Sequence, residues 1–455
     1  MKPCLVRALG IGLLALAAAC DGVQSPGTLP LSIDADLRQS IARWGVVPIG
    51  RMPAQDSALV TLGQALMFDK ILSGNRDIAC ATCHLPSRQL TDGLSLAVGT
   101  GGTGNGPARA LGAGRQFVPR SAPTLLNTGL GLNYLFWDGR IARFGAGPGG
   151  FTTPAGAALP PDLPNVLAAQ AMFPVLDRRE MRGVAGDTDV FGKPNELAQL
   201  GDSQLPQVWA GVMARLRAVP EYVTLFQAAY PSIAPSDLTF ARAAEAIAAF
   251  EMQALTKTDS PFDRYLARDD GALSVEQKRG GLLFFGKAQC GSCHNGPFLG
   301  ANGFANTAAP QVGPGVGAEL PLDLGRAAVD GSSFYRFAFR IAPLRNVELT
   351  APYFHDGAYP TLEAVVRHYN NARAALSAFS DTLLAPAVRG DYHGDGVTIA
   401  GVLQSLDFRL QRPLGLTEGE MADLVAFLKS LTDPSARDLR LVAPARVPSG
   451  LPVDR

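Results

Sequence analysis

The chain has no excess of charge of either sign, because 40 Lys and Arg residues balance 40 Asp and Glu residues. Without a basic surplus or a basic run, nucleic acid is a poor candidate partner. Tyrosine and phenylalanine are few, 9 and 22, beside 50 Gly and 34 Pro. This composition predicts modest helices joined by long ordered loops, with little sheet. A chain of 455 residues with 47% hydrophobic content can bury more than one core, so we expect at least two domains.

The N-terminal apolar run, residues 8–19, is too short to span a bilayer as a helix of the mature protein. Lys2 and Arg7 precede it and small residues come just before Cys20, which is typical of a signal peptide over residues 1–20 and predicts export to the periplasm. The sequence Ala-Ala-Ala before Cys20 also resembles a lipoprotein cleavage box, although Ala17 stands where a larger aliphatic residue is usual. Lipidation of Cys20 is therefore left open, and it would provide the only membrane contact that we expect.

Cysteine is scarce as well: there are six, and Cys4 and Cys20 belong to the leader. The other four form two Cys-x-x-Cys-His motifs, Cys80, Cys83 and His84, then Cys290, Cys293 and His294. In an oxidising compartment two disulfides or a zinc site are the alternatives, but neither explains the histidine that follows each pair. The motif is the attachment pattern of haem c. It predicts two covalently bound haems, with His84 and His294 as the proximal iron ligands.

Apolar periodicity predicts helices over residues 59–71, 238–255, 274–285 and 418–431. Ser236 and Asp237 are candidate caps of the second helix, and residues 99–114 form a glycine-rich loop. The segment 260–263 is the candidate linker. These elements predict a mainly α fold of two cytochrome c-like domains, residues 34–257 and 262–440, each with one covalently bound haem c.

The supply of iron ligands separates an enzyme from an electron carrier, whose haems are capped on both sides. The chain has five histidines, His84, His294, His355, His368 and His393. None lies between the two attachment motifs, so the first domain has no histidine for the open side of its haem. Met172, Met181 and Met213 remain alternative ligands, but an open first haem, free to bind hydrogen peroxide, is the favoured interpretation.

A series of short motifs resembles the bacterial dihaem cytochrome c peroxidases and covers about residues 57–432. In order, the motifs are Leu62-Gly63, Phe68-Asp69, Leu72-Ser73-Gly74, Ala122-Pro123-Thr124, Phe136-Trp137-Asp138-Gly139-Arg140, Glu180-Met181, Ser260-Pro261-Phe262-Asp263, Leu344-Arg345-Asn346 and Ala351-Pro352-Tyr353-Phe354-His355-Asp356-Gly357. Each motif alone is only weakly specific for the family. In series around two haem attachment motifs they are specific.

The resemblance implies roles for residues of the first domain. Gln170 and Glu180 match the family's pair of residues on the peroxide side of the haem. They are ten positions apart, with Pro174 between them. A carboxylate in that place can move a proton between the two peroxide oxygens. Without the resemblance, the neighbouring arginines in the sequence would favour a surface carboxylate as the interpretation of Glu180. Trp137 matches the aromatic residue between the haems, and ordinary core packing is its alternative.

The resemblance also implies a calcium ion between the domains, held by the backbone carbonyls of Thr350 and Pro352. The family's usual side-chain partner is an Asn just before the Pro-Thr motif. This chain has Ser121 and Ala122 there, so calcium is the least supported of the expected cofactors.

One departure from the peroxidases concerns the second haem. In that family a methionine fourteen residues after the histidine matching His355 caps this haem, and here the position is Tyr369. A tyrosine ligand stabilises oxidised iron, whereas a thioether raises the potential. A tyrosine at this position resembles the MauG-like branch of the family, which includes MbnH. Members of that branch share oxidising equivalents across both haems and use them to oxidise residues of another protein. His368 is the competing ligand by one residue.

A second departure is a Gly- and Pro-rich insertion over residues 145–165. It fits a docking loop or a tolerated surface insertion equally well, and together with the following residues 169–174 it favours the MbnH-like relatives. The resulting prediction is an exported enzyme that uses hydrogen peroxide to oxidise a partner protein, with a small copper-binding protein as one candidate. The alternatives are a peroxidase that receives electrons from a small cytochrome or cupredoxin, and a non-enzymatic dihaem electron carrier.

Overall fold

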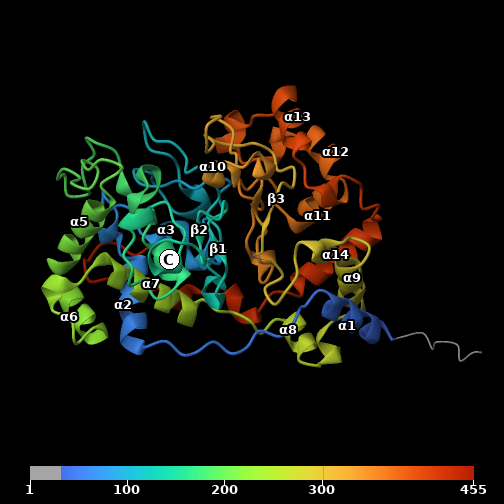
Figure 1. Cartoon of the computed structure of the whole chain (residues 1–455), viewed down its shortest axis with the longest axis horizontal. Coiled ribbons are helices and arrows are strands. Elements are labelled where there is room, and N and C mark those ends of the chain that lie inside the picture. The colour runs from blue at the N-terminus through green and yellow to red at the C-terminus, as the bar shows by residue number, and fades with distance from the viewer. Residues whose placement is uncertain (1–31, 301) are drawn as a thin grey trace, which may run out of the picture.

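The computed structural model describes residues 32–300 and 302–455, so the leader and Cys20 lie outside the described residues. Helices dominate (Figure 1), and the strands pair in two short antiparallel ladders, with Tyr134 opposite Ala142 and Phe304 opposite Arg340. The predicted mainly α architecture with little sheet is confirmed. None of the helices described is long and apolar enough to cross a bilayer.

The helices are α1 (Ile33–Arg43), α2 (Ser57–Phe68), α3 (Cys80–Cys83), α4 (Val166–Ala171), α5 (Leu205–Arg217), α6 (Pro220–Ala229), α7 (Phe240–Ala254), α8 (Pro261–Leu266), α9 (Val275–Phe285), α10 (Ala327–Asp330), α11 (Leu362–Asn370), α12 (Ala372–Ser377), α13 (Gly396–Gln404) and α14 (Glu418–Lys429). The strands are β1 (Tyr134–Leu135), β2 (Ile141–Ala142), β3 (Phe304–Ala305) and β4 (Phe339–Arg340).

Local hydrogen bonding decides where the predicted helices begin and end. The first is interrupted at Asp69, whose extended backbone stops α2 and whose carboxylate caps a separate turn, Lys70–Leu72. The predicted caps Ser236 and Asp237 are wrong: both lie in an earlier turn, Pro235–Asp237, and Thr239 is the residue that precedes α7. The other two helices have capping boxes. Each box pairs the hydroxyl residue before the helix with a residue three positions later, Ser274 with Gln277 in α9 and Thr417 with Glu420 in α14.

The two largest hydrophobic cores of the described residues lie side by side (Figure 1). The first is built largely from α2, α4, α5, α6 and α7, drawn on the left, and includes Leu62, Met172 and Phe226. The second is built from α1, α8, α9, α11 and α14, drawn on the right, with Phe262 and Phe427 at its centre. We call these the first and second halves.

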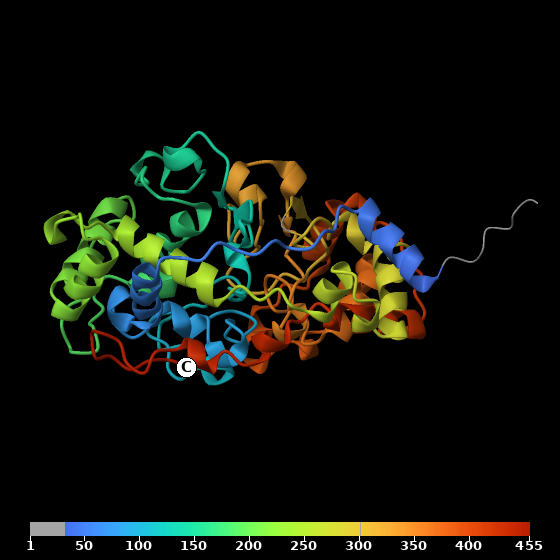
Figure 2. The same ribbon diagram turned by 90° about the horizontal axis from the view of Figure 1, so that it is seen from below.

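Both ends of the described chain pack against the half to which they are not adjacent in sequence (Figure 2). Helix α1 belongs to the second core through Leu37 and Ile41, although residue 34 begins the first domain in the predicted division. The segment after residue 432 returns to the first half. There Ala436, Leu439 and Val447 pack with Met67 and Phe68 of α2.

A buried ion triplet joins the halves. Arg120 lies 2.6 Å from Asp138 and 2.7 Å from Asp323, and all three side chains are buried. Burial alone would raise the pKa of the Asp138 carboxyl, but Arg120 and Arg140 hold it at about 2. Removing one member would leave an uncompensated buried charge, so the triplet fixes the segment that carries Trp137 against the second half.

Candidate functional site

The first attachment motif forms a single helical turn, α3. The thiols of Cys80 and Cys83 are three residues apart and are not joined to each other or to another described cysteine. The Ala79 N–H donates to Thr82 Oγ1 at 2.9 Å, which holds the start of the turn. Nδ1 of His84 lies 3.0 Å from Leu90 O. A carbonyl partner at Nδ1 fixes the ring and leaves Nε2 as the metal-binding nitrogen, the usual arrangement of a ligating histidine.

The residues predicted for the peroxide site come together with this turn around one partly open cavity, whose empty space, together with the solvent at its mouth, is about 510 Å³. It is lined by Met67, Ile78, Ala79, Cys80, Cys83, His84, Leu125, Gln170, Ala171, Pro174, Glu180, Met181, Ile247 and Glu251. Most of these side chains are apolar. Gln170, Pro174 and Glu180 therefore face the same space as the two thiols and His84. We call this space the first cavity.

Glu180 lies in a π-helical turn, Arg178–Arg182, capped by the Asp177 carboxylate. The Thr100 N–H donates to Glu180 O at 2.9 Å, so the glycine-rich loop holds this turn in place. Burial, and then Asp177, raise the pKa of the Glu180 carboxyl to about 8. Arg178 turns outward instead, to Asp202 at 2.7 Å. Glu180 therefore lines the first cavity and is not a carboxylate of the outer surface.

Gln170 lies at the end of α4, and Pro174 begins the next turn, Pro174–Leu176. Asn165, the last residue of the insertion, caps α4 by accepting from the Ala168 N–H at 2.9 Å. Within the insertion, Phe151, Leu159 and Leu163 belong to the first core. The insertion is therefore packed against the protein over part of its length and leads directly into the helix that carries Gln170.

Sequence reasoning missed Glu251, which lines the same cavity from α7. The available signal was one acidic residue, four positions after Ile247, on the buried side of a predicted helix. Of the three methionines kept as alternative ligands, Met181 lines the cavity, whereas Met172 and Met213 are buried in the first core.

The second attachment motif begins with a tighter turn, Cys290–Ser292, followed by Cys293 and His294. Nδ1 of His294 lies 3.1 Å from Leu299 O, which matches the arrangement of His84 in the first half. Burial lowers the pKa of His294 to about 4 and so favours the neutral imidazole that a metal requires. Arg409 donates to Ser292 O at 3.2 Å and braces the turn.

The two competing ligands of the second haem differ in how they are bound. Both ring nitrogens of His368 are engaged, Nδ1 by the Tyr359 hydroxyl at 2.8 Å and Nε2 by Thr307 O at 2.7 Å. Burial and then Cys293 raise the pKa of the Tyr369 phenol, and a hydrogen bond with the Thr307 side chain lowers it. The structure thus engages both ring nitrogens of His368 and places Tyr369 in the neighbourhood of Cys293.

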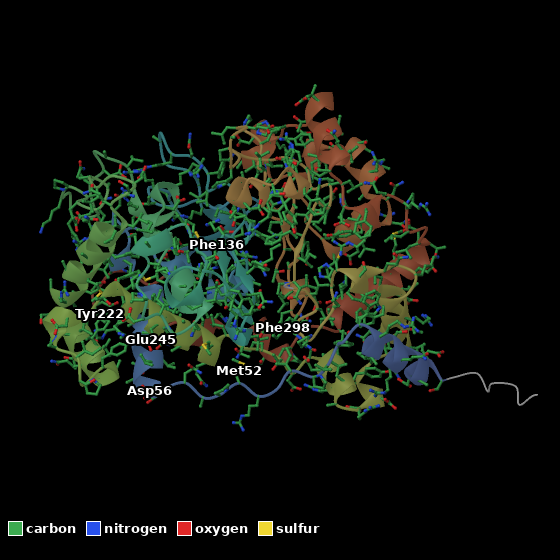
Figure 3. All side chains as sticks on the ribbon, viewed as in Figure 1. Met52, Asp56, Phe136, Tyr222, Glu245 and Phe298 are labelled. Atoms are coloured by element: carbon green, nitrogen blue, oxygen red, sulfur yellow. The ribbon has the colours of Figure 1, made fainter. Side chains whose placement is uncertain are left out.

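Trp137 lies on the boundary between the halves. Its indole N–H donates to Ser121 O at 2.9 Å, and its carbonyl accepts from the Arg340 N–H at 2.7 Å. The neighbouring Phe136 and the distant Phe298 also lie near this boundary (Figure 3), and both pack against the first core. This position is consistent with the predicted place of Trp137 between two haems.

The residues predicted to hold calcium are next to one another, but the structure offers few side-chain ligands there. The Thr350 hydroxyl donates to Val347 O, and the Ser121 hydroxyl donates to Leu94 O. Among residues 32–300 and 302–455 no cluster of three or more His, Cys, Asp or Glu side chains is arranged to hold a metal ion. Calcium at the Thr350 and Pro352 carbonyls stays a prediction.

The residues present fit a haem c in each half. Each half supplies two unpaired thiols and an imidazole whose Nδ1 is held by a carbonyl. Two arginines of the second half each have a buried guanidinium nitrogen without a hydrogen-bond partner among the described residues, Nη1 of Arg340 near Trp137 and Nη2 of Arg345 near Pro297. Haem propionates are carboxylates, and Arg is the residue best suited to bind them.

Comparison with known proteins agrees with this site. The family model described as di-haem cytochrome c peroxidase matches residues 57–271. The methylamine utilization protein MauG of Methylorubrum extorquens is 30% identical over 380 residues, which is 83% of this chain and 79% of that protein. The cytochrome c551 peroxidase of Pseudomonas aeruginosa is 34% identical over 316 residues, 69% and 71% of the two chains.

Solved structures agree as well. A MauG-like protein associated with microbial copper homeostasis superposes with a TM-score of 0.57 at 26% identity, covering 87% of this chain and 95% of its own. The diheme peroxidase BthA from Burkholderia thailandensis has a TM-score of 0.54, covering 90% of this chain and 96% of its own, and at 20% identity it shows the fold alone.

The fold and the sites define a dihaem oxidoreductase. The chain belongs to the di-haem cytochrome c peroxidase and MauG family. It is therefore a haem-dependent enzyme whose family implies two haem c groups, and the alternative of a non-enzymatic carrier is set aside.

Proposed function

We propose that this protein activates hydrogen peroxide in the first cavity and passes the oxidising equivalents through the second half to residues of a partner protein. When bound, the haems supply the iron that reacts with peroxide and the redox centres that hold the equivalents. Cys80, Cys83 and His84 would hold one haem, and Cys290, Cys293, His294 and Tyr369 the other. Trp137 would shorten the path between them.

In the first cavity the chain's own side chains position peroxide and move its proton. Glu180 in its ionised form accepts a proton from one peroxide oxygen and returns it to the other as the O–O bond breaks. The Gln170 amide can donate to or accept from the same peroxide and so orients it. The apolar lining supplied by Met67, Ile78 and Ile247 limits the number of competing water molecules.

The observation that carries the proposal is the difference between His368 and Tyr369. His368 is hydrogen-bonded at both ring nitrogens and so is not free to bind iron, whereas Tyr369 is in the neighbourhood of Cys293, which raises the pKa of its phenol. An oxygen ligand from Tyr369 would stabilise oxidised iron in the second half. That property suits a site that stores an oxidising equivalent more than a site that is reduced easily by a donor protein.

The partner is proposed from the comparisons together with this site. The MauG-like structural relative is described as associated with microbial copper homeostasis, which supports a small copper-binding protein as substrate. The second candidate function is a peroxidase fed by a small cytochrome or cupredoxin, supported by the 34% identity to a cytochrome c551 peroxidase. Export to the periplasm and the calcium ion at Thr350 and Pro352 complete the proposal.

The test replaces each competing ligand in the holoprotein. We expect Tyr369→Phe to remove the low-spin signal of the second haem in electron paramagnetic resonance spectra while both haems stay attached. The matched variant His368→Gln, which keeps a donor and an acceptor for Tyr359 and Thr307, should retain that signal. Tyr369→Met should raise steady-state oxidation of a reduced small cytochrome c by peroxide.

The opposite pattern would contradict the proposal. If His368→Gln removed the low-spin signal and Tyr369→Phe kept it, the ligand would be His368. If the unmodified protein already oxidised reduced cytochrome c rapidly and Tyr369→Met made no difference, the electron-fed peroxidase would be the correct function.

A further inference from the structure

Glu251 is a buried carboxyl of the first cavity to which the proposed chemistry gives no role. It is 3% exposed on α7, one helical turn after Ile247, and both side chains line the cavity. Helix α7 packs against α4, the helix that carries Gln170. Met252, the next residue, contacts the Asn165 side chain that caps α4, with 3.9 Å between Sδ and Nδ2. Glu251 therefore lines the same cavity as Gln170 and Glu180, on a helix packed against the one that carries Gln170.

The hydrogen bonds around Thr128 indicate which form of Glu251 is present. The Thr128 hydroxyl oxygen lies 2.9 Å from Leu125 O and 2.9 Å from Oε2 of Glu251. A hydroxyl has one proton to donate, and a backbone carbonyl can only accept. If each contact has a proton of its own rather than sharing the one hydroxyl proton, Thr128 donates to Leu125 O and the carboxyl of Glu251 donates to Thr128. That arrangement requires Glu251 to be a neutral carboxylic acid.

The electrostatic surroundings favour the same form. Of the residues that line the cavity, the titratable ones are Cys80 and Cys83 of α3, His84 after it and Glu180 of the π-helical turn. No Lys or Arg is among them. Burial raises the pKa of Glu251 to about 7 against the opposing hydrogen bond from Thr128. A carboxylate buried without a cation is costly, so the neutral acid is the stable form below that pH.

We infer that Glu251 is a proton donor reserve of the first cavity, which supplies a proton for the water formed there. The inference rests on the proposed function. Reduction of hydrogen peroxide consumes two electrons and two protons: the O–O bond breaks and two waters form. Glu180 moves a proton from one oxygen to the other and adds none. Protons lost by an oxidised partner residue are released at the partner, outside the cavity, so the cavity must obtain its own.

Glu251 meets that need as a positioning residue that acts through Glu180 or through cavity water. It starts neutral, gives its proton as the second water forms, takes another from solvent and gives that one too, so that both protons of the reduction pass through it. As pH rises through about 7, Glu251 ionises and the reserve is lost. Turnover limited by proton supply should therefore fall as pH rises through that value, while the Thr128 contact survives with the hydroxyl turned toward the carboxylate.

The test is infrared difference spectroscopy of the holoprotein at pH 6, combined with the pH profile of turnover. Glu251→Gln should remove one carbonyl band of a neutral carboxylic acid that shifts in deuterium oxide, and Thr128→Val should shift that band without removing it. Steady-state peroxide turnover should fall by about a hundredfold in Glu251→Gln, the low end for acid–base help, and lose its decline above pH 7. Glu245→Gln, on the same helix (Figure 3) but paired with Arg242 at 2.7 Å, is the control and should change neither band nor profile.

The outcomes separate this inference from the proposed function. A carboxylic acid band that persists in Glu251→Gln, or an unaltered pH profile, would overturn the inference whatever the protein oxidises. Loss of the band in Glu251→Gln together with a peroxide reaction that does not depend on Glu180 would support the neutral acid and contradict the proposed proton chemistry.

Discussion

The two halves present nearly the same attachment turn to very different surroundings. His84 and His294 both place Nδ1 against a carbonyl, at 3.0 Å from Leu90 O and 3.1 Å from Leu299 O. In the first half the cavity beside this turn holds an amide and two carboxyls with raised pKa values, those of Glu180 and Glu251. Beside the second turn the Phe284 ring lies 6.4 Å from the ring of His294, measured between centroids.

The aromatic groups of the second half form a connected cluster. The Phe354 ring lies 5.9 Å from Tyr369, and Tyr359 lies 5.1 Å from the ring of His368, measured between centroids. Its imidazole is already engaged, Nδ1 of His368 by the Tyr359 hydroxyl and Nε2 by Thr307 O, so it is not available to an incoming peroxide. The comparison teaches that the five-residue motif holds a haem in place, whereas residues about 90 positions away in sequence, such as Gln170 and Glu180, decide what that haem can do.

Removing one attachment site at a time tests the difference between the halves directly and should have the largest effect on haem content and on the reaction with peroxide. Cys80→Ala combined with Cys83→Ala should yield a protein with one covalent haem and no fast reaction with peroxide, because the acid groups face only the first site. Cys290→Ala combined with Cys293→Ala should also lose one haem by mass spectrometry but keep a haem that reacts with peroxide. Retention of two covalent haems in either double variant would contradict the assignment.

Glu180→Gln should have the next largest effect, because it removes proton transfer while it keeps side-chain volume. We expect the peroxide reaction, followed by stopped-flow absorbance, to slow by about a hundred- to ten-thousand-fold with both haems still attached. In the unmodified protein the rate should rise with pH through about 8, since the ionised form is the base and burial raises the pKa to that value. The variant should lose this rise.

Glu196→Gln is the matched control for that measurement. Glu196 is also in the first half, but it pairs with Arg215 at 2.6 Å and does not line the cavity. It should leave the peroxide rate unchanged. Equal rates for Glu180→Gln and the unmodified protein would mean that Glu180 does not transfer the proton.

Much of the candidate site could be predicted from sequence because its signals are local. The attachment motifs are five residues long, and the interval from Gln170 to Glu180 spans one helix and two turns. The choice between Tyr369 and His368 could not be decided locally. It depends on Thr307 and Tyr359, which engage both nitrogens of His368, and Thr307 is 61 positions away.

The parts that sequence missed are tertiary. Glu251 looks like any acidic residue of a helix until α7 turns it into the cavity and Thr128 contacts it. The exchange of α1 and the C-terminal segment between the halves leaves no periodic signal, because each segment is short and packs against residues far away in the chain. A division of the chain into two domains at the linker 260–263 therefore leaves out two sets of contacts between the halves, those of α1 and those of the C-terminal segment.

The smallest expected effect concerns the C-terminal segment, which covers the attachment turn of the first half, whereas Trp44 after α1 packs on Gly291 of the second turn. Asp454 is buried, accepts from the Thr82 hydroxyl at 2.5 Å and pairs with Lys70 at 3.0 Å. Since Thr82 lies between the two cysteines of the first motif, this contact ties the end of the chain to that turn. Asp454→Asn should lower the free energy of unfolding of the first half by about 1.5–3 kcal/mol, the usual worth of hydrogen bonds to a charged group.

Urea unfolding of the holoprotein, followed at the absorbance of the first haem, measures this loss. Asp438→Asn is the control, because Asp438 pairs with Arg440 on the surface of the same segment and a surface pair contributes little. The second haem should report the same midpoint in all three proteins if the segment stabilises only the half it covers. An equal shift at both haems would instead mean that the exchanged segments make the two halves unfold as one unit, in which case the halves differ in chemistry but not in stability.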